Sequence, residues 1–150
     1  MDMKGIRDIA ERFDCDRIYF FGSQADKGRK YLTGEDVRAD FFSDLDIAVS
    51  FREPPAEAIK IYGQIYREMS ELLEPFNVDL VFMHELGTLL QYEIIKGLRV
   101  YEENDRLTDE FEEEVLKRAG DLVFKEKILE REIMEAIEDG YIEFEYSPNP

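Results

Sequence analysis

The sequence predicts an α/β domain: a small β-sheet with flanking helices, followed by a C-terminal helical extension. Short apolar runs alternate with segments whose apolar residues recur at helical spacing, and the last third of the chain keeps helical spacing. The 150 residues are 44% hydrophobic and include eleven phenylalanines, enough for the core of one globular domain. We expect residues 1–105 to form that core and residues 106–150 to form an acidic helical extension with a tail.

The first part of the chain predicts a helix, a strand, an irregular segment and a second strand. Residues 3–13 place apolar side chains on one side of a helix, and 17–22, "RIYFFG", is an apolar strand that stops at a glycine. Residues 23–43 contain two glycines and no sustained periodicity, which predicts a short helical turn followed by a loop or small hairpin. The segment 43–51, "SDLDIAVSF", is the second strand.

The second part continues the alternation. The expected elements are, in order, a helix over 54–76 opened by prolines, a strand over 77–83, a helix over 86–98 closed by Gly97, and a brief strand over 99–103. From 107 to about 137 the pattern predicts one long helix, or two helices broken near Gly120. The tail after Gly140 predicts an edge strand or a flexible end. We expect the helices to lie on one side of the sheet.

Composition narrows the class of function. With 36 acidic and 19 basic side chains the net charge is −17, which disfavours a nucleic-acid substrate because phosphate backbones are repelled. Small phosphate-bearing anions are not excluded, since a bound cation can reverse the local field. The single cysteine, Cys15, excludes an intrachain disulfide and a cysteine metal cage. The first residues do not read as a signal peptide and no run is long enough to span a membrane, so we expect a cytoplasmic protein.

The strand "SDLDIAVSF" carries two aspartates at its head. Aspartate is depleted in strands, and residues two apart, such as Asp44 and Asp46, lie roughly 6–7 Å apart on one face. Asp79 in "NVDLVF" is a third carboxylate inside an apolar strand. An Asp-x-Asp pair alone is often a turn or a cap, but the strand context disfavours that explanation. Clustered carboxylates repel each other unless a cation neutralises them, so the pattern predicts a magnesium or manganese site.

A glycine turn precedes this strand in the sequence. Gly22 follows the first strand directly and Ser23 opens the helical turn, where free N–H groups favour a phosphate group. The densest basic cluster lies just downstream and consists of Lys27, Arg29 and Lys30. The segment predicts a nucleotide-binding turn. An ordinary Gly-Ser turn with a solvated charge run remains the alternative, and is the more common case for a Gly-Ser pair taken alone.

The ordered set "FGS … SDLDIAV … VDLVF" resembles the nucleotidyltransferase superfamily of the DNA polymerase β type. The segment "LLQYEIIKGLRVYEEN" is similar to the minimal nucleotidyltransferases of prokaryotes, and the resemblance covers roughly residues 17–105. It implies the nucleotidyltransferase fold with a small mixed sheet. It also implies that Gly22 and Ser23 hold a nucleoside triphosphate, and that Asp44, Asp46 and Asp79 bind two Mg²⁺ ions, with Mn²⁺ as the alternative. The segment between Ser23 and Asp44 is longer than in many minimal members, which indicates an insertion beside the site.

The same resemblance implies a function. It predicts transfer of a nucleoside monophosphate, AMP from ATP, to a hydroxyl group, with Asp79 receiving or positioning the proton. Minimal nucleotidyltransferases are commonly paired with toxins that carry a higher-eukaryote-and-prokaryote nucleotide-binding (HEPN) domain, and act as antitoxins by modifying a toxin tyrosine. We expect such a partner to dock on the acidic C-terminal helix, because residues 102–145 hold 17 acidic and 6 basic side chains. A binding antitoxin with a vestigial site and an aminoglycoside-type nucleotidyltransferase remain the alternatives.

Overall fold

The computed structural model describes residues 3–40 and 43–140, and its centre is a four-stranded mixed sheet. The strands are β1 (Cys15–Phe21), β2 (Leu45–Phe51), β3 (Val78–Phe82) and β4 (Leu98–Glu102), arranged in the order β3-β2-β1-β4. β1 is antiparallel to both β2 and β4, whereas β2 and β3 are parallel. All four predicted strands are confirmed, and so is the mixed sheet.

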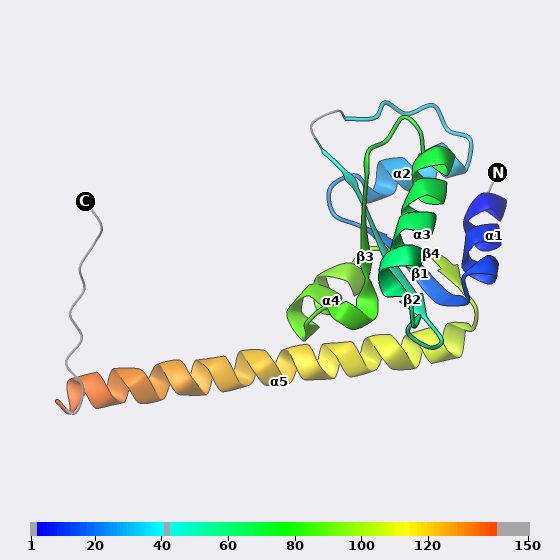
Figure 1. Cartoon of the computed structure of the whole chain (residues 1–150). Coiled ribbons are helices and arrows are strands. Elements are labelled where there is room, and N and C mark those ends of the chain that lie inside the picture. The colour runs from blue at the N-terminus through cyan, green and yellow to red at the C-terminus, as the bar shows by residue number, and fades with distance from the viewer. Residues whose placement is uncertain (1–2, 41–42, 141–150) are drawn as a thin grey trace.

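Five α-helices surround or extend this sheet in the described residues (Figure 1). They are α1 (Lys4–Arg12), α2 (Ala25–Leu32), α3 (Ala58–Leu72), α4 (Thr88–Ile95) and α5 (Asp105–Glu138). The short 3-10 turn Met83–Glu85 follows β3. The predicted helices are confirmed, although α3 begins at Ala58, after the two prolines rather than at them.

The helices lie on both faces of the sheet, because alternate residues of each strand point to opposite sides. On one face α1, α2 and α3 pack on Ile18, Phe20, Leu45, Ile47 and Val49. On the other face Tyr19 and Ala48 pack with Ile94 of α4, and Phe111 of α5 lies against them. The expectation of helices on one side is therefore wrong. The sequence segments after β3 contain enough apolar residues to cover the second face.

The last helix, α5, is a single continuous helix that passes through Gly120 without a break. Its first turn is capped by Asn104, whose side chain accepts a hydrogen bond from the Leu107 N–H at 3.0 Å. Its buried residues, Thr108, Val115 and Ala119, all lie in the first half, and the second half extends beyond the sheet (Figure 1). No helix in the described part of the chain is long and apolar enough to cross a membrane.

The segment between α2 and β2 carries no strand in its described residues, 33–40 and 43–44. The predicted helical turn is therefore confirmed as α2, while the hairpin expected as one alternative is not found in these residues. The predicted tail over 141–150 lies outside the described residues.

Candidate active site

The sheet register brings two of the three aspartates side by side. Asp46 of β2 and Asp79 of β3 are direct partners in the parallel pairing, so both side chains project from the same face of the sheet. Asp46 is half-buried, whereas Asp79 is exposed. Asp44 is also exposed, and it lies just before β2 rather than within it. The sequence therefore predicted the strand positions of Asp46 and Asp79, but placed Asp44 one step too far inside the strand.

The electrostatics of Asp46 reflect this crowding. Burial raises the pKa of the Asp46 carboxyl, and the negative charges of Asp79 and Asp44, with a hydrogen bond to Asp79, raise this pKa further. None of the ion pairs found between described residues involves any of the three aspartates. The site is thus a cluster of like charges whose repulsion a cation would relieve.

The donor set fits a divalent metal by its chemistry. Carboxylate oxygens are the ligands that magnesium and manganese prefer. Within residues 3–40 and 43–140, however, no group of three or more acidic, histidine or cysteine side chains is arranged to hold an ion as the side chains stand. Magnesium commonly uses one or two carboxylates together with substrate phosphates and water, so a preformed cage is not required. Metal binding by Asp44, Asp46 and Asp79 stays a prediction.

Gly22 lies directly against this cluster. It follows Phe21, which pairs with Asp46 across β1 and β2, and it has a positive φ of 75° that L side chains rarely adopt. A Cβ atom at Gly22 would also collide with the Asp46 carboxylate. Glycine is therefore required at position 22 for two reasons, the backbone conformation and the lack of space for a Cβ atom. The turn predicted to bind phosphate is thus adjacent to a predicted metal ligand.

A second glycine, Gly28, brings α2 close to the sheet. A Cβ atom there would lie 2.8 Å from both terminal methyl groups of Leu45 and 3.2 Å from the Phe20 ring. This close packing holds the middle of α2 near the head of β2. In the sequence Gly28 indicates only irregular structure, because nothing in the local pattern shows which residues a helical glycine faces.

Gln24, which lies between Ser23 and α2, was not predicted as a site residue from the sequence. Gln24 is only 5% exposed, and its Nε2 donates a hydrogen bond to Ser23 Oγ at 3.4 Å. Its Oε1 is buried and has no hydrogen-bond partner among the described residues. A polar residue directly after the Gly-Ser pair was the available signal. Ser23 itself is exposed, as a residue that binds a ligand from solution must be.

The three predicted cations all lie on α2, and no ion pair between described residues joins them to Asp44, Asp46 or Asp79. Arg29 and Lys30 each form an ion pair with Asp26 at 3.0 Å, and the Lys30 hydrogen bond holds the pKa of Asp26 below its usual value. Lys27 is exposed. The structure thus brings Gly22, Asp46 and Asp79 together but not the basic cluster, whose nucleotide-binding role stays a prediction.

Comparison with known proteins agrees with this arrangement. The family described as "Polymerase beta, Nucleotidyltransferase" matches residues 4–106, more than two thirds of the chain. The chain belongs to this nucleotidyltransferase family. The matched residues include the glycine turn and all three aspartates. The resemblance inferred from the sequence is confirmed, and with it the assignment as a nucleotidyltransferase.

Solved structures show the same nucleotidyltransferase fold at low sequence identity. A chain from a toxin–antitoxin structure with AMP-PNP is 18% identical with a TM-score of 0.61, and the alignment covers 89% of this chain and 99% of that chain. A chain from the structure of tri-AMPylated Shewanella oneidensis HEPN toxin with MNT antitoxin is 16% identical with a TM-score of 0.60, covering 88% and 95%. A chain from the toxin–antitoxin MntA–HepT is 16% identical with a TM-score of 0.59, covering 88% and 96%. The curated proteins give no match.

Proposed function

We propose that this nucleotidyltransferase transfers AMP from ATP to a tyrosine hydroxyl of a HEPN-type toxin and so acts in the cytoplasm as its antitoxin. The observation that carries the reaction is the direct pairing of Asp46 with Asp79 beside the Gly22 turn. This arrangement puts a phosphate-binding turn and a metal-attracting carboxylate pair at one end of the sheet. A protein with no catalytic role has no use for the unfavourable crowding that raises the pKa of Asp46.

Each side chain has a proposed role. Gly22 and Ser23 bind the triphosphate, with the Ser23 hydroxyl donating to a phosphate oxygen. Lys27, which is exposed on α2, attracts the nucleotide, while Arg29 and Lys30 add positive charge that Asp26 partly offsets. Asp44, Asp46 and Asp79 hold Mg²⁺, two ions in the full complex with Mn²⁺ as the alternative, which would neutralise charge on the phosphates.

The chemistry proposed for the acceptor depends on Asp79. The acceptor hydroxyl attacks the α-phosphorus of ATP, a new O–P bond forms, and the bond to pyrophosphate breaks. Asp79, exposed on the outer strand, accepts or positions the proton that the hydroxyl loses. The products are an AMP ester of the acceptor, and pyrophosphate.

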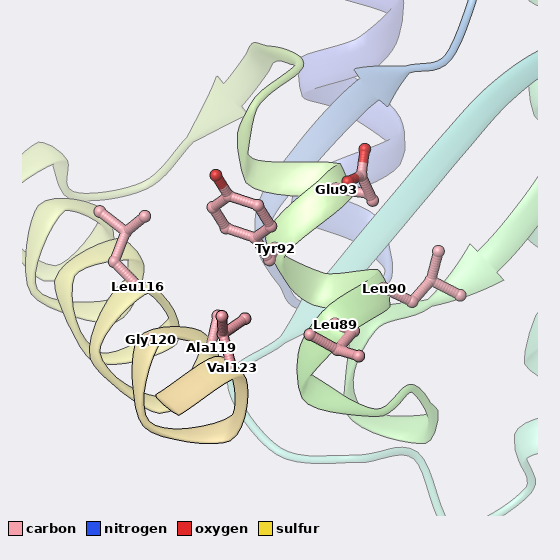
Figure 2. A pocket seen from close by; sticks show the side chains of 8 residues that line it. All are labelled: Leu89, Leu90, Tyr92, Glu93, Leu116, Ala119, Gly120 and Val123. Carbon is pink, nitrogen blue, oxygen red and sulfur yellow. The ribbon is translucent and has the colours of Figure 1, made fainter. Parts of the chain in front are cut away.

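The toxin partner is proposed from the fold neighbours and from an unpartnered groove. The neighbours are chains of toxin–antitoxin structures, one of which contains a tri-AMPylated HEPN toxin. In this chain a groove of about 710 Å³ lies between α4 and α5 rather than over the aspartates. Its apolar lining includes Leu89 and Leu90 on α4 and Leu116 and Val123 on α5. Figure 2 shows the two helices side by side, with Leu89 on the side of α4 towards α5. We propose that α5 and this groove bind the toxin.

The charge on α5 is distributed unevenly. Residues 105–114 carry six acidic and one basic side chain, whereas residues 115–138 carry six acidic and five basic side chains. Two of the early acidic residues, Asp109 and Glu112, already form ion pairs with Arg99. Beyond Val115 and Ala119, which are buried, apolar residues recur at helical spacing but are exposed: Leu122, Leu129 and Ile133. We call these five residues the apolar stripe of α5, and propose that its exposed part contributes more to docking than the negative charge does.

The test is a transfer assay with the intact chain. The purified protein is incubated with Mg²⁺, ATP labelled at the α-phosphate, and a HEPN-domain protein from the same genome, and tyrosine-linked AMP is located by mass spectrometry. We expect labelling by the wild type, and a loss of more than about a hundredfold in Asp79→Asn, which removes a proposed metal ligand and proton acceptor. Binding of the HEPN protein by Asp79→Asn is measured in parallel by calorimetry and should be unchanged.

Other outcomes would support the alternatives. Tight binding of the HEPN protein without any labelling by the wild type would show a non-catalytic antitoxin with a vestigial site. Labelling of an aminoglycoside in place of the HEPN protein would show a small-molecule nucleotidyltransferase. Equal labelling by wild type and Asp79→Asn would remove Asp79 from the catalytic set.

A further inference from the structure

Gln24 is a buried polar residue to which the proposed function gives no role. It is only 5% exposed and occupies the N-cap position of α2, directly after Gly22 and Ser23. Glutamine is not among the residues that favour an N-cap, and the Gln24 side chain makes no capping hydrogen bond. Neither helix capping nor contact with solvent therefore explains why a glutamine occupies this position.

The side-chain amide of Gln24 has a hydrogen-bond partner at one end only. Its Nε2 donates to Ser23 Oγ at 3.4 Å, which is the one hydrogen bond that this side chain forms among the described residues. Its Oε1 is buried and has no partner among them. A buried acceptor without a partner destabilises the folded state, and an apolar side chain of similar shape would avoid this loss. The need for a stable fold therefore does not explain the amide either.

The backbone at Gln24 is held in place by the packing of α2. The Gly28 N–H donates a hydrogen bond to the Gln24 carbonyl oxygen at 2.9 Å, and Gly28 packs so closely on Leu45 that a Cβ atom would lie 2.8 Å from it. Leu45 is the first residue of β2 and precedes Asp46. Gln24 is thus tied, through α2, to the strand that carries the half-buried aspartate of the site.

The direction of the hydrogen bond decides what the Ser23 hydroxyl can do. A serine hydroxyl has one proton to donate and two lone pairs that accept. The Gln24 amide occupies one lone pair, so the Ser23 proton stays available for another acceptor. Ser23 is exposed whereas Gln24 is buried, so a ligand from solution reaches the hydroxyl and not the amide. An ionised phosphate oxygen, which only accepts hydrogen bonds, matches the available proton.

We propose that Gln24 is a positioning residue that orients the Ser23 hydroxyl to donate to the triphosphate. This inference rests on the proposed function, in which Ser23 binds the triphosphate, and it assigns the residue that prepares Ser23 for this contact. A hydroxyl that donates to an anionic oxygen becomes a better acceptor itself, because successive hydrogen bonds polarise one another. We therefore expect the 3.4 Å bond from Gln24 to shorten when the nucleotide binds.

The test is a double-mutant cycle on nucleotide binding, which requires no acceptor protein. Calorimetry measures the dissociation constant of ATP with Mg²⁺ for wild type, Ser23→Ala, Gln24→Met and the double variant. We expect binding about tenfold weaker in Ser23→Ala and about fivefold weaker in Gln24→Met, because methionine fills a similar space but cannot donate a hydrogen bond. The double variant should bind no more weakly than Ser23→Ala, since Gln24 acts through the Ser23 hydroxyl.

Thermal unfolding distinguishes this positioning role from a structural one. Gln24→Met removes the buried oxygen that has no partner, so its unfolding midpoint should equal or exceed that of wild type while its ATP affinity falls. Gln64→Met makes the same substitution at an exposed glutamine of α3, and should change neither the midpoint nor the affinity. A lower midpoint of Gln24→Met together with wild-type ATP affinity would show that Gln24 serves the fold instead.

The outcomes also separate this inference from the proposed function. Wild-type ATP affinity in Gln24→Met, or an equal loss on adding Gln24→Met to Ser23→Ala, would overturn the role of Gln24 alone. Wild-type affinity in Ser23→Ala would remove Ser23 from the triphosphate site and overturn the inference with it. If the cycle gives the expected result but the wild type transfers no AMP to the HEPN protein, the proposed reaction fails and the role of Gln24 stands.

Discussion

At the scale of single residues, the candidate site is marked by residues that are unfavourable for folding in their local environment. Asp46 is a half-buried carboxylate in a strand, next to two further negative charges. Burial raises its pKa, and the two neighbouring charges raise this pKa further. Gly22 has a backbone conformation that other residues avoid and no room for a Cβ atom. Both features cost folding free energy, and residues that do so at the end of a sheet are typical of functional sites.

The raised pKa of Asp46 predicts a pH-dependent gain in stability for Asp46→Asn. The folded state favours the protonated carboxyl, so the charged Asp46 carboxylate destabilises the folded wild type. This destabilisation is fully present above the raised pKa, and it disappears as the pH falls through that pKa towards 3.8, the ordinary pKa of an aspartate. The neutral amide carries no such cost. We expect urea unfolding without divalent cations to show Asp46→Asn more stable than wild type at pH 7, with a smaller difference at pH 4.

Added Mg²⁺ supplies the control for this prediction. The cation should stabilise the wild type more than Asp46→Asn, because the amide removes one of the three charged ligands proposed for it. At a concentration a hundredfold above the dissociation constant, the cation would add about 2.7 kcal/mol to the stability of the wild type. Asp121→Asn, which removes an exposed carboxylate on α5, should show neither effect. A lower stability of Asp46→Asn at pH 7 would contradict the crowding inferred for the site.

At the scale of elements, the two helical glycines Gly28 and Gly120 have opposite environments. A Cβ atom at Gly120 would meet nothing within 4 Å, whereas one at Gly28 would lie 2.8 Å from Leu45. The sequence presents both as glycines in a helical pattern. Only their packing shows that Gly28 allows α2 to approach the sheet, and that α5 does not need Gly120 for its own packing.

We expect Gly120→Ala to stabilise the protein by about 1 kcal/mol and Gly28→Ala to destabilise it. Alanine favours the helical backbone at both positions, but the methyl group at Gly28 forces Leu45 or α2 to move. The measurement is the thermal unfolding midpoint, which should rise by about 2–4 °C for Gly120→Ala in a chain of this size. A higher midpoint for Gly28→Ala would show that α2 is less closely packed than the structure indicates.

At the scale of the whole molecule, the second half of α5 is the part that the rest of the described chain does not cover. The first half packs through Thr108, Val115 and Ala119, and α4 borders the helix as far as Val123. The apolar stripe continues beyond this point through Leu129 and Ile133, both of which are exposed. An apolar side of a helix that extends past its own domain fits an interface with another protein.

This arrangement predicts that exposed residues in the second half of α5 contribute to binding the HEPN protein but not to the stability of the fold. The double variant Leu129→Ala with Ile133→Ala should change the free energy of unfolding by less than about 0.5 kcal/mol, because both side chains are exposed. Its affinity for the HEPN protein should fall about tenfold. Ile94→Ala, which empties a fully buried position in α4, should cost about 2–5 kcal/mol of stability. Unchanged affinity in the double variant would move the docking surface away from α5.

The sequence predicts the secondary structure of this chain better than it predicts burial and the ends of strands. The four strands, the helices and the order of the glycine turn and the aspartates follow from local patterns, because periodicity and turn residues are properties of neighbouring positions. Gln24 could not be recognised as buried, and Asp44 could not be placed outside β2. Burial and strand ends depend on which segments pack together, and no local pattern encodes that.

By itself, then, the sequence determined the α/β class, a net charge of −17, and the presence of an Asp-x-Asp strand, a later strand aspartate and a Gly-Ser turn. Only the tertiary structure decided that Asp46 pairs with Asp79, that Gly22 contacts the Asp46 carboxylate, and that helices cover both faces of the sheet. It also decided that Tyr62 borders the Asp79 strand, through a hydrogen bond between residues 18 positions apart. The physical reason is that composition and periodicity are summed along the chain, whereas a site is made by contacts between strands and helices distant in sequence, whose register and packing are fixed only when the whole core forms.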